Sequence, residues 1–323
     1  MCYSAQIYAD FRKYEHLGGT PELREFALFF EERKKKGDWM KRVPKPMRDA
    51  FNSPSNESER EINDIAQTAY KDAVLELEAE ITALSEHLMK AMAAQTSINP
   101  SNMTHVGLLS ANSKISKARA KLAALGDKAD ADGLARIWFN SFCPLLIRSP
   151  GTGQRSIVPM RYQCRLPGWT TKDEWFNLKT KIARREELFT EWRQLFGHNH
   201  GVIVARRFDE SVPLHRMEQR EQDPDESESN VVIKFEPDPE QDLLLACLWN
   251  YTEASENAAG FYSFAIIKSE PPPEVSAAGS DQCVIAIKPE NLEAWLNPHA
   301  HTLNDMIAIL DHPVEVHFKH EVL

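Results

Sequence analysis

The chain opens with Met1-Cys2, and Cys2 is the residue whose position could confer unusual chemistry. Removal of Met1 would leave Cys2 with a free α-amine and a thiol, whose ordinary pKa values are about 8 and about 8.5. Both groups are then partly deprotonated at neutral pH, so the residue can attack a carbonyl with either group or close a five-membered ring with both. The alternative is that a second-position cysteine is an accident of the translation start.

The composition predicts an ordinary globular chain. Its 323 residues are 42% hydrophobic and 27% charged, which suits one large domain or one domain with a substantial insert. The apolar runs fall short of the ~18 residues that span a bilayer, and the polar start lacks the hydrophobic stretch of a secretion signal. We therefore expect a cytoplasmic protein without a membrane partner.

The cysteines and histidines predict neither disulfides nor a metal centre. The five cysteines are odd in number, widely scattered and without a Cys-x-x-Cys pair. They are Cys2, Cys143, Cys164, Cys247 and Cys283. Gly197 to Gly201 holds two histidines, but no acid or cysteine is placed to complete a metal shell, so we expect a tight turn there. We expect no cofactor.

The net charge of −10 argues against a nucleic-acid partner, but the distribution of charge weakens that objection. Eight basic residues and one acid lie between Arg33 and Arg48, with Trp39 among them. A second basic cluster comprises Lys179, Lys181, Arg184 and Arg185, while acids crowd into residues 218–228. Local fields decide what binds in a groove, although either basic run could equally be a solvated surface.

The hydrophobic pattern predicts an α+β fold. Helices are expected over 21–36, 53–95, 105–125, 172–196, 289–296 and 302–310. Strands are expected over 145–148, 157–165, 201–208, 231–235, 243–251, 261–268, 283–288 and 314–321. This spacing favours an antiparallel, barrel-like sheet with flanking helices in a single domain over 1–323. The segment at about 53–126 is predicted to be an inserted helical hairpin, structural in role, with a partner-docking arm as the alternative.

An ordered set of short blocks resembles the SRAP family, the SOS-response-associated peptidases. The blocks are Met1-Cys2, residues 159–165, Ala183-Arg184-Arg185, Phe208-Asp209-Glu210, residues 245–249, residues 263–267 and residues 281–296. The order matches at the start and over about 135–300, and it resembles a longer bacterial branch of the family. The extra helical sequence before the main sheet would account for the insert.

This resemblance implies a sensor of abasic sites in single-stranded DNA. The resemblance implies that the cysteine at position 2 is exposed by loss of the initiator methionine, through the protein's own peptidase-like action. The cysteine then traps the ring-opened sugar as a Schiff base that closes to a thiazolidine. The expected protein is bacterial, cytoplasmic, associated with the nucleoid on damage, and monomeric.

The resemblance also assigns roles to particular residues. Glu210 occupies the family's acidic position, where a carboxylate can shuttle protons during imine formation. Arg184 falls on the arginine that grips backbone phosphate. The other candidates along the DNA path are Arg185, Arg161, Lys179 and Trp169, and Trp39 and Trp175 are further candidates to stack unpaired bases. Trp249 and Trp295 are expected in the core.

Three positions depart from the family pattern. Ile182 stands where the family has an asparagine, Ser280 where it has a histidine, and Asp209 where an aromatic residue is usual. Ser280 can donate a hydrogen bond but cannot titrate near neutrality. We therefore expect trapping of the aldehyde to persist while reversal or peptide cleavage is impaired. The alternatives are a diverged single-stranded DNA-binding module without the chemistry, and a peptidase that uses Cys2 on protein substrates.

Overall fold

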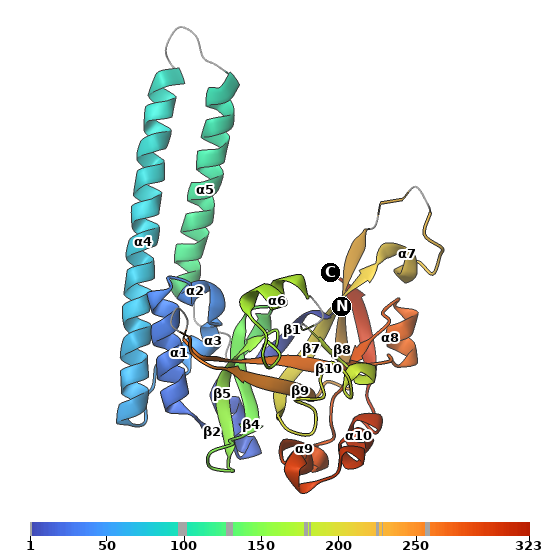
Figure 1. Cartoon of the computed structure of the whole chain (residues 1–323). Coiled ribbons are helices and arrows are strands. Elements are labelled where there is room, and N and C mark those ends of the chain that lie inside the picture. Colours follow the sequence, from blue (N-terminus) through green and yellow to red (C-terminus); the bar gives the residue numbers. More distant parts are fainter. Residues whose placement is uncertain are drawn as a thin grey trace.

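The structure is a computed structural model that describes residues 2–95, 102–126, 132–177, 180, 182–223, 226–227, 229–255 and 259–323. Figure 1 shows a strongly curved sheet with short helices around it and a long helical hairpin at one end. The strands are β1 Cys2–Tyr8, β2 Thr20–Pro21, β3 Leu134–Ile137, β4 Phe142–Arg148, β5 Arg155–Tyr162, β6 Ile182–Arg184, β7 His200–Pro213, β8 Asn230–Asp238, β9 Leu243–Thr252, β10 Phe261–Ser269, β11 Cys283–Val284 and β12 His317–Val322. The helices are α1 Leu23–Lys35, α2 Trp39–Arg42, α3 Lys45–Asp49, α4 Glu57–Gln95, α5 Asn102–Gly126, α6 Thr171–Phe176, α7 Leu214–Met217, α8 Pro273–Ala277, α9 Leu292–Leu296 and α10 Leu303–Asp311.

The strand pairings run in a ring. β10 pairs with β5, β5 with β4, β4 with β7, β7 with β9, and β9 with β10. Other strands branch from this ring, so the 12-stranded sheet is ring-like and mostly antiparallel but is not a simple barrel. Residues 243–250 of β9 are all buried, as expected for a strand enclosed on both faces. The α+β prediction is confirmed in this form.

An aromatic cluster holds together the segments over residues 11–51. Phe11, Phe26, Phe30 and Phe51 are fully buried, and the Phe11 and Phe51 ring centroids lie 4.9 Å apart. Trp39 packs edge-on against Phe30 at 6.2 Å and is 3% exposed. The hypothesis that Trp39 stacks unpaired bases is therefore wrong, because its indole belongs to this core.

Helices α4 and α5 form the expected antiparallel pair (Figure 1). The first turn of α4 is capped by Asn56, whose side-chain oxygen accepts from the Glu59 amide at 2.9 Å. Ile62 and Ala66 are fully buried at the base of α4, whereas Leu75 further along is 64% exposed. Only the base of the hairpin thus belongs to the core. None of the helices in the described ranges is long and apolar enough to cross a membrane.

The helix predicted over 172–196 is wrong. Helix α6 ends at Phe176, and residues 182–184 form strand β6 instead. β6 lies parallel to β10, with Ile182 opposite Ile266 and Ala183 opposite Ile267. Burial of these apolar side chains against β10 outweighs the helix propensity of the surrounding lysines, arginines and glutamates. The strand predicted over 283–288 is also shorter than expected, since β11 ends at Val284.

Candidate active site

The backbone of Cys2 lies directly opposite Glu210. β1 runs antiparallel to β7, and Cys2 is the Cα partner of Glu210. Opposed residues on antiparallel strands have Cα atoms about 4.5–5.5 Å apart. A bulge between this pair and the next one, Ser4 with Asp209, changes the register of β1 just after Cys2.

Glu210 forms a buried ion pair that the sequence did not predict. Its Oε1 atom lies 2.5 Å from the Nζ atom of Lys268, and both side chains are 0% exposed. Lys268 lies near the end of β10, directly after the buried residues Phe264 to Ile267. The signal available in the sequence was a lone lysine directly after the apolar run of residues 264–267. Such a residue needs a buried acidic partner, but the sequence does not say which.

Asp209 anchors the strand that carries Cys2. The Ser4 hydroxyl donates to Asp209 Oδ2 at 2.5 Å, and Arg136 Nη2 lies 2.7 Å from the same oxygen. Arg136 Nε also donates to the Ser4 hydroxyl at 2.8 Å. Because Ser4 is on β1, Asp209 on β7 and Arg136 on β3, this triad ties three strands together beside Cys2. The Asp209 carboxylate thus stabilises the packing of these three strands.

Ser280, which the resemblance places at the family's histidine position, makes its hydrogen bond within its own loop. Ser280 is buried, and its hydroxyl donates to the Gln282 carbonyl at 2.9 Å. The preceding Gly279 has φ +92°, and a Cβ there would lie 2.8 Å from the Met217 backbone nitrogen, so only glycine fits. Ile182, at the family's asparagine position, is 6% exposed and packs on β10. Neither Ser280 nor Ile182 supplies a proton-transfer group.

Among the expected phosphate-binding arginines that the structure describes, Arg184 has the most exposed side chain. Its side chain is 45% exposed, and Nη1 lies 3.6 Å from Glu186. The side-chain amide of Gln282, with its oxygen turned toward Arg184, accepts from Nε and Nη1 at 3.2 Å. Arg185 pairs instead with Asp311 at 2.6 Å. Lys179 lies outside the described residues.

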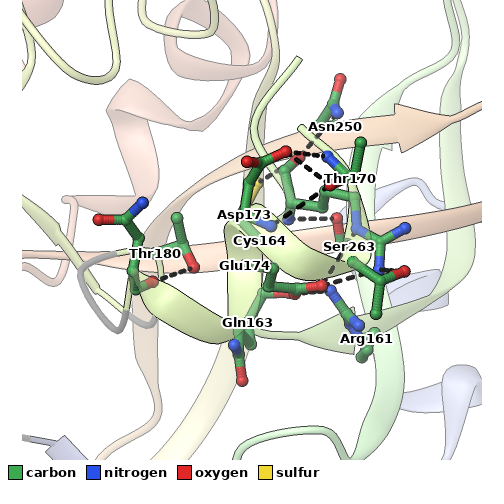
Figure 2. A network of polar contacts seen from close by, with 12 residues as sticks. Arg161, Gln163, Cys164, Thr170, Asp173, Glu174, Thr180, Asn250 and Ser263 are labelled. Carbon is green, nitrogen blue, oxygen red and sulfur yellow. Dashed lines mark hydrogen bonds and ion pairs between the residues drawn. The ribbon is translucent and has the colours of Figure 1, made fainter. Parts of the chain in front are cut away.

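Arg161 belongs to a buried polar network that holds α6 (Figure 2). It pairs with Glu174, as does Arg165 at 2.8 Å, and Glu174 is 5% exposed. Burial lowers the pKa of Arg161, while the adjacent Glu174 carboxylate opposes that shift. A phosphate would have to compete with Glu174 for this guanidinium. Trp169 is half-buried and lies beside the same helix.

The network leaves the far side of α6 open to solvent. Trp175 is 81% exposed and Phe176 is 77% exposed. A capping box starts the helix, in which Thr170 and Asp173 each accept a hydrogen bond from the other's backbone amide. α6 therefore holds two aromatic rings at the surface on a fixed base.

The four internal cysteines are all buried. Burial raises the pKa of Cys164 to about 12 and raises the pKa values of Cys143 and Cys247 well above their ordinary value. A buried, protonated thiol is a poor nucleophile. By elimination, Cys2 is the remaining candidate among the five.

A basic pocket adjoins the triad, because Arg136 is one of its lining residues. Its volume is about 460 Å³, and its lining includes Lys41, Arg42, Lys45, Arg136 and Trp138. The Arg136 guanidinium lies 4.6 Å from the Trp138 ring centroid, and Trp138 is 38% exposed. Part of the basic run at 33–48 therefore lines a concave surface, although Arg48 is buried against Trp39.

His200 stabilises a turn. Its Nε2 atom accepts from the Gly197 amide at 2.8 Å, and Nδ1 lies 3.1 Å from the Trp295 carbonyl. Burial lowers its pKa to about 3, against an opposing contribution from the Trp295 carbonyl. The ring is therefore neutral at physiological pH, with its proton on Nδ1. Trp295 is 0% exposed and Trp249 is 5% exposed, which confirms both as core residues.

The fold and the Cys2–Glu210 register define a ring-like α+β protein with a candidate nucleophile at its amino terminus. The chain belongs to the SOS response associated peptidase (SRAP) family, whose model matches residues 70–321. The resemblance seen in the short blocks is thereby confirmed. Cys2 itself precedes the matched range, so its place in the site depends on the pairing of β1 with β7.

More distant comparisons add little. No curated protein matches the chain. A protein from Bacteroides thetaiotaomicron has 13% identity and a TM-score of 0.46, over 58% of this chain and 77% of that one. A protein from Bordetella bronchiseptica has 17% identity and a TM-score of 0.44, over 58% and 87%. A phage-related protein from the same organism has 16% identity and a TM-score of 0.43, over 62% and 85%. These similarities carry no argument about the site.

Proposed function

We propose that this chain, after loss of Met1, captures abasic sites in single-stranded DNA through a covalent bond to Cys2. The observation that carries the proposal is the register of β1 on β7, which sets the Cys2 backbone opposite the buried Glu210. A carboxylate beside an amine can move the protons that imine formation requires. Family membership supports the same reading of the site.

The proposed chemistry needs no cofactor. The Cys2 amine adds to the C1′ aldehyde of the ring-opened sugar, and Glu210 accepts the proton that the nitrogen loses. The nitrogen gives up two protons in turn, and the same carboxyl delivers both to the former carbonyl oxygen, so water leaves and an imine forms. The thiolate then adds to the imine carbon while the nitrogen takes up a proton. The net change is aldehyde plus aminothiol to thiazolidine plus one water.

Two surfaces suit the DNA strand. Arg184 offers an exposed guanidinium beside the site, and Trp175 offers a ring on which a base can stack. Next to the triad, the pocket lined by Lys41 and Arg136 supplies positive charge beside Trp138. Local charge of this kind binds a phosphate backbone despite a net charge of −10. Arg185, Arg161, Lys179 and Trp169 remain further candidates.

The test is a crosslinking assay on Met1-processed protein. Single-stranded DNA with one abasic site should give a protein–DNA adduct that survives heating in detergent, whereas undamaged DNA should give none. Cys2→Ala retains an amine but no thiol, so its adduct should appear only after borohydride reduction. An equal heat-stable yield from Cys2→Ala without reduction would contradict the proposal.

A binding module without the chemistry is the second candidate, and the buried Ile182 and the committed Ser280 hydroxyl favour it. Mass spectrometry of the purified amino terminus separates the two. Retained Met1 favours the binding module, and a free Cys2 favours the chemical function. The third possibility, a peptidase that uses Cys2, would cleave peptides without forming an adduct on DNA.

A further inference from the structure

The fold and the DNA surface described above assign no role to Lys268. Its ammonium is 0% exposed and lies 2.5 Å from Glu210 Oε1. Burying such a pair costs several kcal/mol per ion in lost hydration, and apolar replacements of similar volume are often neutral or stabilising. A buried pair beside a reactive group is therefore a candidate for function rather than for stability.

The group that would otherwise deliver protons is missing from the neighbouring loop. Ser280 stands at the histidine position of the family, and its hydroxyl is held by the Gln282 carbonyl. The adjacent Asp281 pairs with Arg216 at 3.2 Å. Among the buried charged groups in the described parts of the chain, Lys268 is the one paired with Glu210.

We propose that Lys268 is the general acid of the site and works with Glu210 as the base, a role that depends on the proposed capture of abasic sites. An abasic sugar is a cyclic hemiacetal that must open before the Cys2 amine can attack. In that step Glu210 accepts the proton of the C1′ hydroxyl, the carbonyl forms, and the C1′–O4′ bond breaks. Lys268 gives a proton to O4′.

The pair then resets itself without another reactant. The proton on Glu210 passes to the neutral amine of Lys268 along the 2.5 Å hydrogen bond, which restores carboxylate and ammonium. The C1′ hydroxyl oxygen and O4′ are both bonded to C1′, which is the carbon that Cys2 attacks. Because the Cys2 backbone is opposite Glu210, both oxygens come close to the same ion pair.

The charged groups around the ion pair explain why the acid is Lys268 and not the neighbouring Arg184. Arg184 on β6 is the Cα partner of Lys268 on β10. Its guanidinium faces solvent and Gln282, and it does not release a proton in the physiological range. On β8, Ile233 lies opposite Glu210, and Lys234 pairs with Glu321 at 2.6 Å. The Lys268 ammonium, by contrast, is in direct contact with Glu210.

The experiment compares two DNA substrates. One carries an ordinary abasic site, and the other carries an acyclic aliphatic aldehyde that needs no ring opening. Lys268→Met should slow adduct formation on the ordinary site by about 10²-fold or more, and on the acyclic aldehyde by less than about tenfold. Lys268→Arg keeps the charge but cannot give up its proton, so it should show the same split.

The results distinguish proton donation by Lys268 from a purely structural or purely electrostatic role. Equal losses on both substrates would show that Lys268 only supports the fold, and full activity of Lys268→Arg would show that only its charge matters; either result overturns the proposal. Cys2→Ala should lose the heat-stable adduct on both substrates. If the unmodified protein forms no adduct with either DNA, the capture function itself fails and Lys268 has no such role. Lys319→Met, at an exposed site on β12, serves as the matched control and should change neither rate.

Discussion

Arg184 and Lys268 are direct partners in the parallel pair of β6 and β10, yet their side chains occupy opposite environments. The Arg184 side chain is 45% exposed, whereas that of Lys268 is 0% exposed. The Arg184 guanidinium can thus contact a phosphate from solvent, whereas the Lys268 ammonium can contact only groups inside the site. The two positions should therefore respond differently to mutation.

Arg184→Ala should weaken binding to single-stranded DNA at every sequence and leave the chemistry of bound DNA unchanged. Loss of one phosphate contact lowers the slope of log affinity against log salt by about 0.7 for single strands. Fluorescence anisotropy at several salt concentrations measures that slope. Arg60→Ala, an exposed arginine on α4, is the control. An unchanged slope in Arg184→Ala would exclude a phosphate contact there.

Glu210→Gln should destabilise the protein because it leaves the Lys268 ammonium buried without its counter-charge. Removing one partner of a buried pair typically costs about 3–5 kcal/mol. The double variant with Lys268→Met should recover much of that loss, since neither charge is then buried, but it should not recover crosslinking. Thermal melting and the adduct assay follow the two properties. A double variant less stable than Glu210→Gln would contradict this account.

Native protein should alkylate at Cys2 alone. A thiol with a pKa of about 12, such as that of Cys164, is ionised in only ~10⁻⁴ of molecules at pH 8. Iodoacetamide at pH 8, followed by intact-mass measurement, should add one label to the folded chain and five to the denatured chain. Cys2→Ala should take up no label while folded. Rapid labelling of that variant would mean that the internal thiols are accessible.

Stability should fall below pH 6.5 because of His200. Burial lowers the pKa of its imidazole to about 3, whereas in the unfolded chain it titrates near its ordinary value of about 6.5. The unfolded state therefore binds the proton first, and the contribution of His200 is complete above pH 6.5. It is lost as the pH falls from 6.5 toward 3, by about 1.4 kcal/mol for each pH unit.

Melting temperatures at pH 7, 6 and 5 test this sign. His200→Gln cannot take up the proton, so it should start less stable at pH 7 and lose less stability as the pH falls. His301→Gln, which changes an exposed histidine, should follow the unmodified protein. Parallel curves for His200→Gln and the unmodified protein would refute the assignment.

The fold was predictable where local pattern and tertiary environment agree. Apolar runs placed β4, β5, β7, β9 and β10, because each of these strands is buried over most of its length. Helical spacing likewise placed α4 and α5. It failed over 172–196, where a charged, helix-favouring segment contributes the three-residue strand β6 to the sheet. A pairing with β10, about 80 residues further on, decides that outcome, and no local window contains it.

The candidate site, like the fold, could be predicted from the sequence only in part. Cys2 and Glu210 could be singled out from residue chemistry and family resemblance, but the pairing of two residues 208 positions apart is a property of the folded sheet. Lys268 was missed because it was grouped with a strand, and its partner lies 58 positions earlier. The task of Asp209 became clear only once Ser4 and Arg136 were seen on the same oxygen.

The hairpin of α4 and α5 has a consequence for hydrodynamics. A helix of 39 residues is ~58 Å long, and Figure 1 shows the hairpin standing away from the rest of the molecule. Such a protrusion raises the frictional drag of a 36.8 kDa chain well above that of a sphere of equal mass. A single copy would therefore leave a size-exclusion column early, at the volume of a larger globular standard. Light scattering, which weighs particles regardless of their outline, gives the true molecular weight.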